Sequence, residues 1–329
     1  MSEETETKEE YHNNHNHANL TEEQVEERYK SLRSEIESLR ERISSVMRQK
    51  STSNSNSQKL LKDNANRFTL EKSPAFRCRR NLEGHFGKIY ALHWSHGECD
   101  RMVSASQDGK LLIWNVNTTN KRLAINLKSS WVMTCCYSLN NGFVAGGGLD
   151  SICSIYDVSS TPDGGWHSDK ASCELRQHEG YLSCCRYLDD QQMLTSSGDG
   201  TSILWDVEKA LPIRTFDSKL GDIECLDVHR EKSIFVTGGI DSVCCVWDYR
   251  DDYRSRPVMT LKEQQDGDIT CIKFFPDGNA FVSGCEDNSI HMFDLKSFSL
   301  CNKYHNKQTI KSAPTSMDFT ASGYYLITG

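Results

Sequence analysis

Hydroxyl, imidazole and carboxylate side chains recur in this chain at spacings that a catalytic triad would allow. In a hydrolase, the histidine takes the proton of the hydroxyl while the aspartate holds the imidazole in the correct orientation. Nucleophilic catalysis is therefore the first chemistry to consider. Two such sets occur, and they are His85, Ser104 and Asp108, and His178, Thr195 and Asp199.

A tryptophan six residues after each aspartate changes this interpretation. Trp114 follows the first set and Trp205 follows the second. An aspartate in a tight turn can accept a hydrogen bond from histidine, the histidine bonds the hydroxyl, and the hydroxyl accepts the indole N–H. The two sets are therefore predicted to be buried structural tetrads, and no catalytic residue is assigned.

The same spacing from aspartate to aromatic residue recurs through the carboxyl-terminal part of the chain. A repeat of about 40–45 residues that ends in Trp-Asp is typical of a β-propeller with one four-stranded blade per repeat. We therefore expect an all-β WD-repeat propeller, a rigid scaffold whose function lies in binding. The aromatic residues are 42, 49, 42 and 46 residues apart, and they are Trp114, Tyr156, Trp205, Trp247 and Phe293.

The repeats differ in how completely they keep the tetrad. Blades four and five lack the histidine and have Lys219 and Gln265 near its place. Blade two keeps Asp150 but has Gly146 four residues before it, so its tetrad is expected to be weaker.

The last repeat is incomplete. It begins near Thr315 and reaches only its second strand at Gly329, so the chain holds five complete blades and half of a sixth. Such an arc would leave sheet edges uncovered, which favours aggregation. The chain is therefore expected to be truncated at its carboxyl end, with roughly 50–65 further residues in the full protein, judged by the repeat length.

Fourteen cysteines raise the question of disulfides or a metal site. They include adjacent pairs in strand-like segments, and successive residues of a strand point to opposite faces of the sheet. We interpret them as free buried thiols of a reducing compartment, and no metal site or cofactor is predicted. The polar amino-terminal tail also carries three histidines, His12, His15 and His17. We interpret this tail as disordered and assign no metal site to it.

Charge and hydropathy indicate the class of partner. The net charge of −8 and the pI of about 5.8 argue against nucleic acid as the main ligand. The sequence has no apolar run long enough to span a bilayer and no signal peptide, so we expect a cytosolic protein.

The amino-terminal part divides into three segments before the propeller. We expect a disordered polar tail over 1–20, a coiled-coil helix over 21–50, a linker over 51–76 and the incomplete propeller over 77–329. The helix begins at a capping box formed by Thr21 and Gln24. It carries apolar residues at spacings of 4 and 3, and they are Val25, Tyr29, Leu32, Ile36, Leu39, Ile43 and Val46.

This heptad seam is about three repeats long and predicts a partner helix, because an isolated helix would leave the seam in water. Two alternatives remain open at this point. The helix could pack on its own propeller, or it could form a homodimer.

Several segments of the propeller resemble the β subunit of heterotrimeric G proteins. Besides Gly84–Tyr90 and Ser104–Lys110, the segment Ser129–Cys135 carries the sequence Ser-Ser-Trp-Val-Met-Thr-Cys. Further similar segments are Gly147–Asp150, Gly180–Cys185 and Phe274–Ala280. The resemblance extends from about Val25 to the last residue, although the Asn- and His-rich tail is not typical of the animal members.

The resemblance implies a seven-bladed propeller whose amino-terminal helix forms a coiled coil with a small γ subunit. The prenyl chain of that γ subunit supplies the membrane anchor. It also implies a surface that contacts the GDP-bound α subunit and downstream effectors, and its residues are Lys88, Tyr90, Trp131, Met133, Leu149, Tyr181, Asp222 and Asp268. Glu224 stands where the family usually has Met, and Glu286 where it has Asp.

We therefore expect a non-catalytic signal transducer at the cytoplasmic face of the plasma membrane, acting downstream of G-protein-coupled receptors. A generic WD-repeat scaffold or adaptor is the alternative; it would explain the blades but neither the Ser129–Cys135 segment nor the heptads. An enzyme would require a polar pocket with a perturbed acid, base or metal site. No cluster in the sequence supports one.

Overall fold

The computed structural model divides the chain into two compact units, Met1–Arg77 and Cys78–Gly329. Ser34 and Ser38, which lie inside the predicted coiled-coil segment, are both helical and exposed. The rest of that segment, the tail and the linker to residue 76 lie outside the described residues. The structure describes Ser34, Ser38 and residues 77–329 without 98–99, 160–169, 251–255, 263–266 and 306–309.

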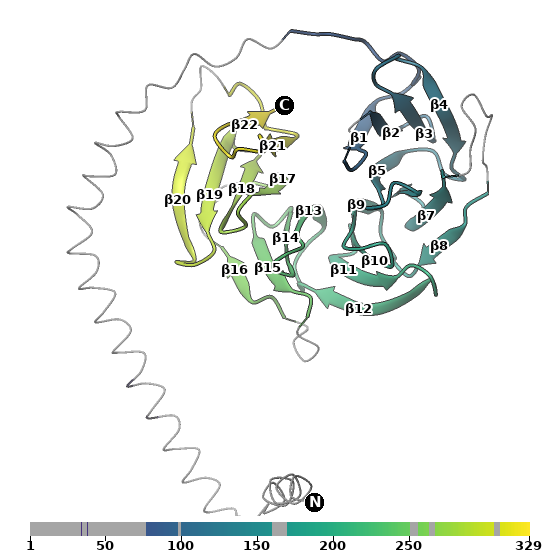
Figure 1. Cartoon of the computed structure of the whole chain (residues 1–329). Helices are drawn as coiled ribbons and strands as arrows, with labels where there is room; N and C mark the ends of the chain where they lie inside the picture. The colour runs from purple at the N-terminus through teal and green to yellow at the C-terminus, as the bar shows by residue number, and fades with distance from the viewer. Residues whose placement is uncertain are drawn as a thin grey trace, which may run out of the picture. The chain divides into compact units, whose positions relative to one another are not determined.

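The second unit consists of consecutive antiparallel sheets, each built from strands in chain order (Figure 1). The first sheet contains β1 (Ile89–Trp94), β2 (Arg101–Ser106), β3 (Lys110–Asn115) and β4 (Lys121–Asn126). The second contains β5 (Val132–Tyr137), β6 (Phe143–Gly148), β7 (Ile152–Asp157) and β8 (Cys173–Arg176). The third contains β9 (Leu182–Tyr187), β10 (Gln192–Ser197), β11 (Thr201–Asp206) and β12 (Leu211–Asp217).

Two more four-stranded sheets and a hairpin complete the described part of this unit. The fourth sheet contains β13 (Ile223–His229), β14 (Ile234–Gly239), β15 (Cys244–Asp248) and β16 (Met259–Leu261). The fifth contains β17 (Ile269–Phe274), β18 (Ala280–Cys285), β19 (Ser289–Asp294) and β20 (Ser299–Tyr304). β21 (Met317–Phe319) and β22 (Leu326–Thr328) pair as a two-stranded sheet.

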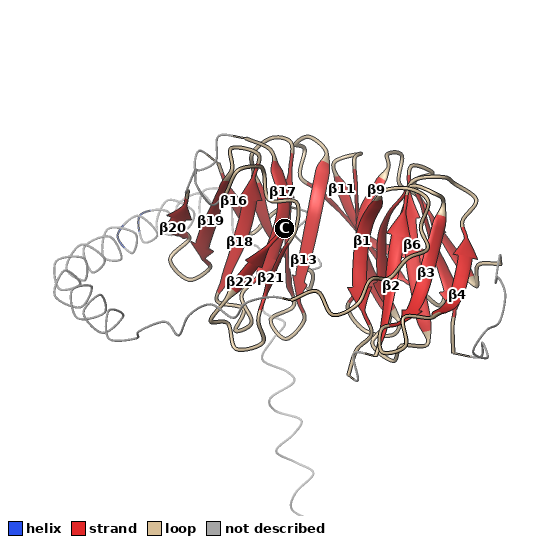
Figure 2. Cartoon of the chain, turned by 90° about the horizontal axis from the view of Figure 1, so that it is seen from above, coloured by secondary structure: helices blue, strands red, loops and turns tan. Residues whose placement is uncertain are grey.

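The first strand of each sheet lies next to the first strand of the following sheet. Contacts run from β1 to β5, β9, β13, β17 and β21 in turn. Figure 1 shows these strands around a common centre, and Figure 2 shows the sheets from the side. The predicted all-β WD-repeat propeller is confirmed.

The adjacent cysteine pairs show how the blades pack. Cys135 belongs to the apolar core between the first and second sheets, whereas Cys136 belongs to the core between the second and third. Cys184 and Cys185 divide between two cores in the same way. The two cysteines of each pair therefore pack into the apolar cores on opposite faces of their strand. The described cysteines are free thiols. Within the described part of the chain, no helix combines the length and the apolar character that crossing a bilayer requires.

A β-bulge interrupts the register at the start of the inner strand in each of the five four-stranded sheets. In β1 the pairing moves from Ile89–Ser106 to Ala91–Ala105, which leaves Tyr90 without a partner across the sheet. The same shift in β5 bypasses Met133, and in β13 it bypasses Glu224. Bulges redirect side chains at sheet ends and beside functional sites. All three bulged residues lie at the end of the propeller where the predicted binding residues gather.

Candidate protein-binding face

The two predicted tetrads are continuous hydrogen-bonded chains. In the first blade, His85 Nδ1 lies 3.0 Å from Asp108 Oδ2, and His85 Nε2 lies 2.7 Å from Ser104 Oγ. The indole Nε1 of Trp114 donates to the same Ser104 oxygen at 2.8 Å. Because that hydroxyl is buried and bonds both rings, it has no path to a substrate.

The third blade repeats this geometry. His178 bonds Asp199 at 2.9 Å and Thr195 at 2.8 Å, and Trp205 donates to the Thr195 hydroxyl at 2.8 Å. Burial alone would raise the pKa of Asp199, but hydrogen bonds from His178, Thr201 and the amide of Glu179 outweigh it and lower the pKa. The carboxylate thus ties the loop before β9 to the turn between β10 and β11.

We expect Thr195→Val to lower the free energy of unfolding by about 1–3 kcal/mol, because it leaves the buried Trp205 indole and His178 Nε2 without their shared partner. Urea unfolding followed by tryptophan fluorescence measures this change. Thr215→Val, on β12 outside the tetrad, is the matched control. Equal stability of the two variants would contradict a structural role for the tetrad.

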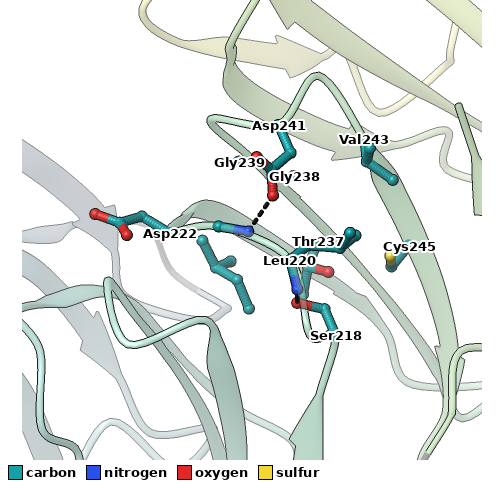
Figure 3. Close-up of a pocket in the computed structure, with 11 residues that line it drawn as sticks. Ser218, Leu220, Asp222, Thr237, Gly238, Gly239, Asp241, Val243 and Cys245 are labelled. Carbon is teal, nitrogen blue, oxygen red and sulfur yellow. Dashed lines mark hydrogen bonds between the residues drawn. The ribbon is translucent and has the colours of Figure 1, made fainter. Parts of the chain in front are cut away.

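Blade four shows what replaces the tetrad where the histidine is missing. The amide of Gly221 donates to Asp241 (Figure 3). In blades one and three the residue directly after the histidine donates to the aspartate. Lys219 keeps the histidine position, because it lies four residues before β13 as His85 does before β1 and His178 before β9. The amide that reaches the aspartate therefore lies one residue further along in blade four. Trp247 still donates to Thr237 Oγ1 at 3.0 Å. A pocket of about 10 Å³ is lined by Asp241 and Thr237, the counterparts of the residues that the imidazole bridges in blades one and three. It has room for about one water.

Blade five keeps its aspartate with different partners. Asp287 accepts from the Ser289 amide at 2.9 Å and from Lys303 Nζ at 3.2 Å. Burial raises the pKa of Asp287, but hydrogen bonds from the Ser289 hydroxyl, Lys303 and the Ser289 amide outweigh it and lower the pKa to about 2. The predicted Gln265 lies outside the described residues.

The eight residues of the predicted α-subunit surface all belong to one end of the propeller. Inner strands start at this end and second strands finish at it, because the two are antiparallel. Lys88, Trp131, Tyr181, Asp222 and Asp268 immediately precede inner strands. Tyr90 and Met133 occupy bulges, and Leu149 lies in the turn between β6 and β7. We name this end the binding face.

Tyr90 and Trp131 form the centre of the apolar part of the binding face. Their rings stack with centroids 6.2 Å apart and an interplanar angle of 27°. Each residue is 40% exposed, and Leu149 beside them is 52% exposed. Large aromatic side chains that are held in place yet remain accessible are the usual anchors of protein interfaces.

The backbone holds Trp131 in an unusual conformation. Its φ is +70°, in the left-handed region that bulky residues rarely adopt. The Trp131 amide donates to Gln107 O at 3.2 Å, and the Trp131 carbonyl lies against Gly148, where an added Cβ would approach to 1.9 Å. Such conformations persist where the surroundings enforce them, often at functional sites. Gly148 is therefore required for the observed position of the indole.

We expect Gly148→Ala to cost about 1–3 kcal/mol of unfolding free energy, because the methyl group has to displace the Trp131 carbonyl. The matched control is Gly267→Ala, since a Cβ at Gly267 would meet its nearest atoms at 3.3–3.4 Å. Urea unfolding of both variants measures the difference. A Gly148→Ala protein as stable as the control would show that the Trp131 loop is not tightly fixed.

Tyr181 joins the third and fourth blades in the polar part of the binding face. Its hydroxyl donates to Glu224 Oε1 at 2.6 Å and to Asp222 Oδ2 at 3.2 Å. Burial, followed by these carboxylates, raises the pKa of Tyr181, so the phenol stays protonated and donates. The bulge at Glu224 carries this carboxylate toward the phenol, so this position makes a polar contact.

The structure groups the predicted residues unevenly. It brings Tyr90 to Trp131 and Tyr181 to Asp222, whereas Asp268 lies further round and accepts the Glu286 amide through its carbonyl at 2.9 Å. The sequence reasoning missed Phe86, which is 91% exposed in the loop before β1. Its position directly after the tetrad His85 is the signal that could have revealed it, since the tetrad fixes that loop at this end.

The chain matches a protein-family model described as "G protein beta WD-40 repeat protein" over residues 27–329. It is 40% identical over 261 residues to a protein of Arabidopsis thaliana named "Guanine nucleotide-binding protein subunit beta", covering 77% of this chain and 68% of that one. A Nicotiana tabacum protein of the same name is 40% identical over 263 residues, covering 77% and 68%. A Dictyostelium discoideum protein, also of that name, is 52% identical over 162 residues, covering 49% and 45%.

Proposed function

This chain belongs to the G protein β WD-40 repeat family, and we propose that it is a non-catalytic transducer that binds a γ subunit and a GDP-bound α subunit. The observation that carries the proposal is the binding face itself. An accessible Tyr90–Trp131 stack, enforced by Gly148, lies at the end of the propeller where the family resemblance puts the α-subunit contact. A rigid, partly apolar surface of this kind is suited to a protein partner.

The proposed mechanism is occlusion of one surface by alternative partners. The α subunit in its GDP state covers Lys88, Tyr90 and Trp131. Exchange for GTP reorders the switch segments of the α subunit and weakens these contacts. The same face then becomes available to effectors, and the propeller itself does not have to change shape. The blade tetrads support this role because they fix the loops of the face before a partner arrives.

The charged residues of the binding face indicate which partner residues are expected opposite each side of it. Lys88 is exposed on the aromatic side, and Asp222 with Glu224 forms the acidic side around Tyr181. We therefore expect an α subunit whose contact surface has apolar residues opposite Trp131 and cationic residues opposite Asp222. Complementary charge of this kind raises association rates and selects partners.

Pairing with the γ subunit is proposed for the heptad seam at Val25–Val46, whose side chains lie outside the described residues. The prenyl chain of the γ subunit would then hold the complex at the cytoplasmic face of the plasma membrane. The chain itself needs no lipid anchor in this arrangement. Signalling from a G-protein-coupled receptor to effectors follows from the same assignment.

Co-expression of the full protein with a prenylatable γ subunit, followed by pulldown of an α subunit, tests the proposal. We expect retention of the α subunit with GDP and its release with a non-hydrolysable GTP analogue. Nucleotide-independent capture, or no capture in either state, would favour the generic scaffold instead. That alternative keeps the propeller but assigns no role to the strained Trp131 loop.

A further inference from the structure

A second polar cluster lies at the opposite end of the inner strands. The fifth residue of each inner strand is His93 in β1, Cys136 in β5, Arg186 in β9, Asp227 in β13 and Lys273 in β17. In five successive repeats the same position therefore carries four ionisable polar groups and one thiol. These strands surround the centre of the propeller (Figure 1), so equivalent positions converge there.

All of these residues except Cys136 line a cavity of about 280 Å³ between β1, β9, β13 and β17. Arg186, Arg230 and Lys273 contribute cationic groups, while Asp227 is the carboxylate among the described lining residues. Asp227 Oδ2 accepts from the Phe274 amide at 2.8 Å, and its Oδ1 lies 3.5 Å from Lys273 Nζ. The exposed Asp318, outside the lining, also lies 3.7 Å from Lys273 Nζ. Three cations therefore face one lining carboxylate, which is already engaged with the backbone, and one exposed carboxylate at the edge.

Backbone carbonyl groups fix both guanidinium groups. Arg186 Nη1 donates to Cys185 O at 2.7 Å, and Arg230 Nε donates to Tyr187 O at 3.1 Å. A guanidinium has five N–H donors in a planar fork, so each arginine has further donors that a ligand can use. The two groups are thus held in place without being neutralised by these contacts.

Two imidazole groups add directional donors. His93 Nδ1 accepts from the Tyr137 amide at 3.3 Å, which places the proton of the neutral ring on Nε2. His96 is anchored by Asn141 through its backbone, while its Nε2 is buried and makes no hydrogen bond within the described part of the chain. A buried nitrogen of this kind is costly unless it meets a partner.

The electrostatics of the cavity favour a negative occupant. Burial, followed by the charges of Arg186, His96 and Lys273, lowers the pKa of His93 to about 3. Burial likewise lowers the pKa of Arg230. Both shifts reflect positive charge that is removed from water. At Arg186 burial is outweighed by the nearby Cys184 and Asp227, which raise the pKa of that guanidinium and keep it charged.

We propose that this cavity is a binding site for a phosphate-bearing anion. Arginine forks match the oxygen pairs of a phosphate group, and a lysine adds a point charge. Phosphate oxygens also accept from the imidazole N–H groups of His93 and His96. The cavity is large enough for a phosphate group with further substituents or water. It lies away from the binding face, so an anion and an α subunit can bind at the same time.

The test uses the full protein co-expressed with its γ subunit and isothermal titration calorimetry at low salt. The probes are inorganic phosphate and myo-inositol hexakisphosphate. We expect Arg230→Gln combined with Lys273→Gln to weaken binding at least about tenfold, since two charge-assisted contacts are lost. Arg230→Lys with Lys273→Arg keeps the charge and is expected to retain binding. Lys209→Gln, which removes an exposed charge paired with Asp206, is the control.

Vesicles with and without phosphatidylinositol 4,5-bisphosphate distinguish the source of the phosphate. Binding of the soluble probes that depends on Arg230 and Lys273 identifies a free ligand. Binding confined to the phosphoinositide vesicles, with the same dependence, identifies a lipid headgroup. The proposal is overturned if no probe binds, or if the Gln double variant binds as well as wild type. Capture of the α subunit by that variant tests the proposed function separately.

Discussion

Replacing Trp131 by alanine is expected to weaken binding of a GDP-bound α subunit about 30-fold or more, which corresponds to at least about 2 kcal/mol. The indole is 40% exposed, stacks on Tyr90 and is fixed by the backbone at a φ of +70°. A preorganised aromatic side chain loses little conformational entropy on binding, so most of its contact energy contributes to affinity. Surface plasmon resonance with the immobilised α subunit measures the change.

The controls separate loss of contact from loss of fold. Phe298→Ala removes another exposed aromatic side chain, from the turn between β19 and β20 at the opposite end of the propeller. It should leave α-subunit affinity unchanged. Lys88→Ala should weaken the affinity less than Trp131→Ala, because an exposed charge is already well solvated. If Trp131→Ala and Phe298→Ala bind equally, the binding face is assigned wrongly.

The sequence predicted the repeats and tetrads because both are local in each blade. The distance from Asp108 to Trp114 is set by one hairpin, and the same hairpin recurs at Asp199 and Trp205. The alternation of apolar residues likewise placed Cys135 and Cys136 on opposite faces. One local detail was missed: in blade four the amide that bonds the aspartate belongs to Gly221, two residues after Lys219, and not to the residue directly after the histidine position.

The sequence pattern did not predict the contacts between blades. The Tyr90–Trp131 stack and the Tyr181–Glu224 hydrogen bond join residues 41 and 43 positions apart in the chain. Their formation depends on bulges that redirect Tyr90 and Glu224, and a bulge leaves no clear trace in composition. The central cavity was missed for a related reason: its polar residues come from several repeats, and each of them looks like ordinary variation within its own repeat. Comparing the fifth position of all inner strands would have revealed it.

Placing a charge in the heptad seam is expected to abolish pairing with the γ subunit. Leu39 and Ile36 lie in the middle of the seam, and a coiled coil buries such positions against the partner helix. An aspartate there loses the leucine contacts and has to give up its hydration, a combined cost of several kcal/mol. We therefore expect Leu39→Asp to leave no γ subunit in the co-purified complex, as judged by affinity capture and mass spectrometry.

Ser38→Asp is the matched control for this prediction. It adds the same charge one residue earlier, at a helical and exposed position off the seam, so γ pairing should persist. If Leu39→Asp retains γ, then the helix has another role, and packing on the propeller or homodimerisation becomes the better explanation. If both variants lose γ, added charge rather than the seam is responsible. Only a loss confined to Leu39→Asp supports a heptad interface, because the two variants add the same charge at neighbouring positions.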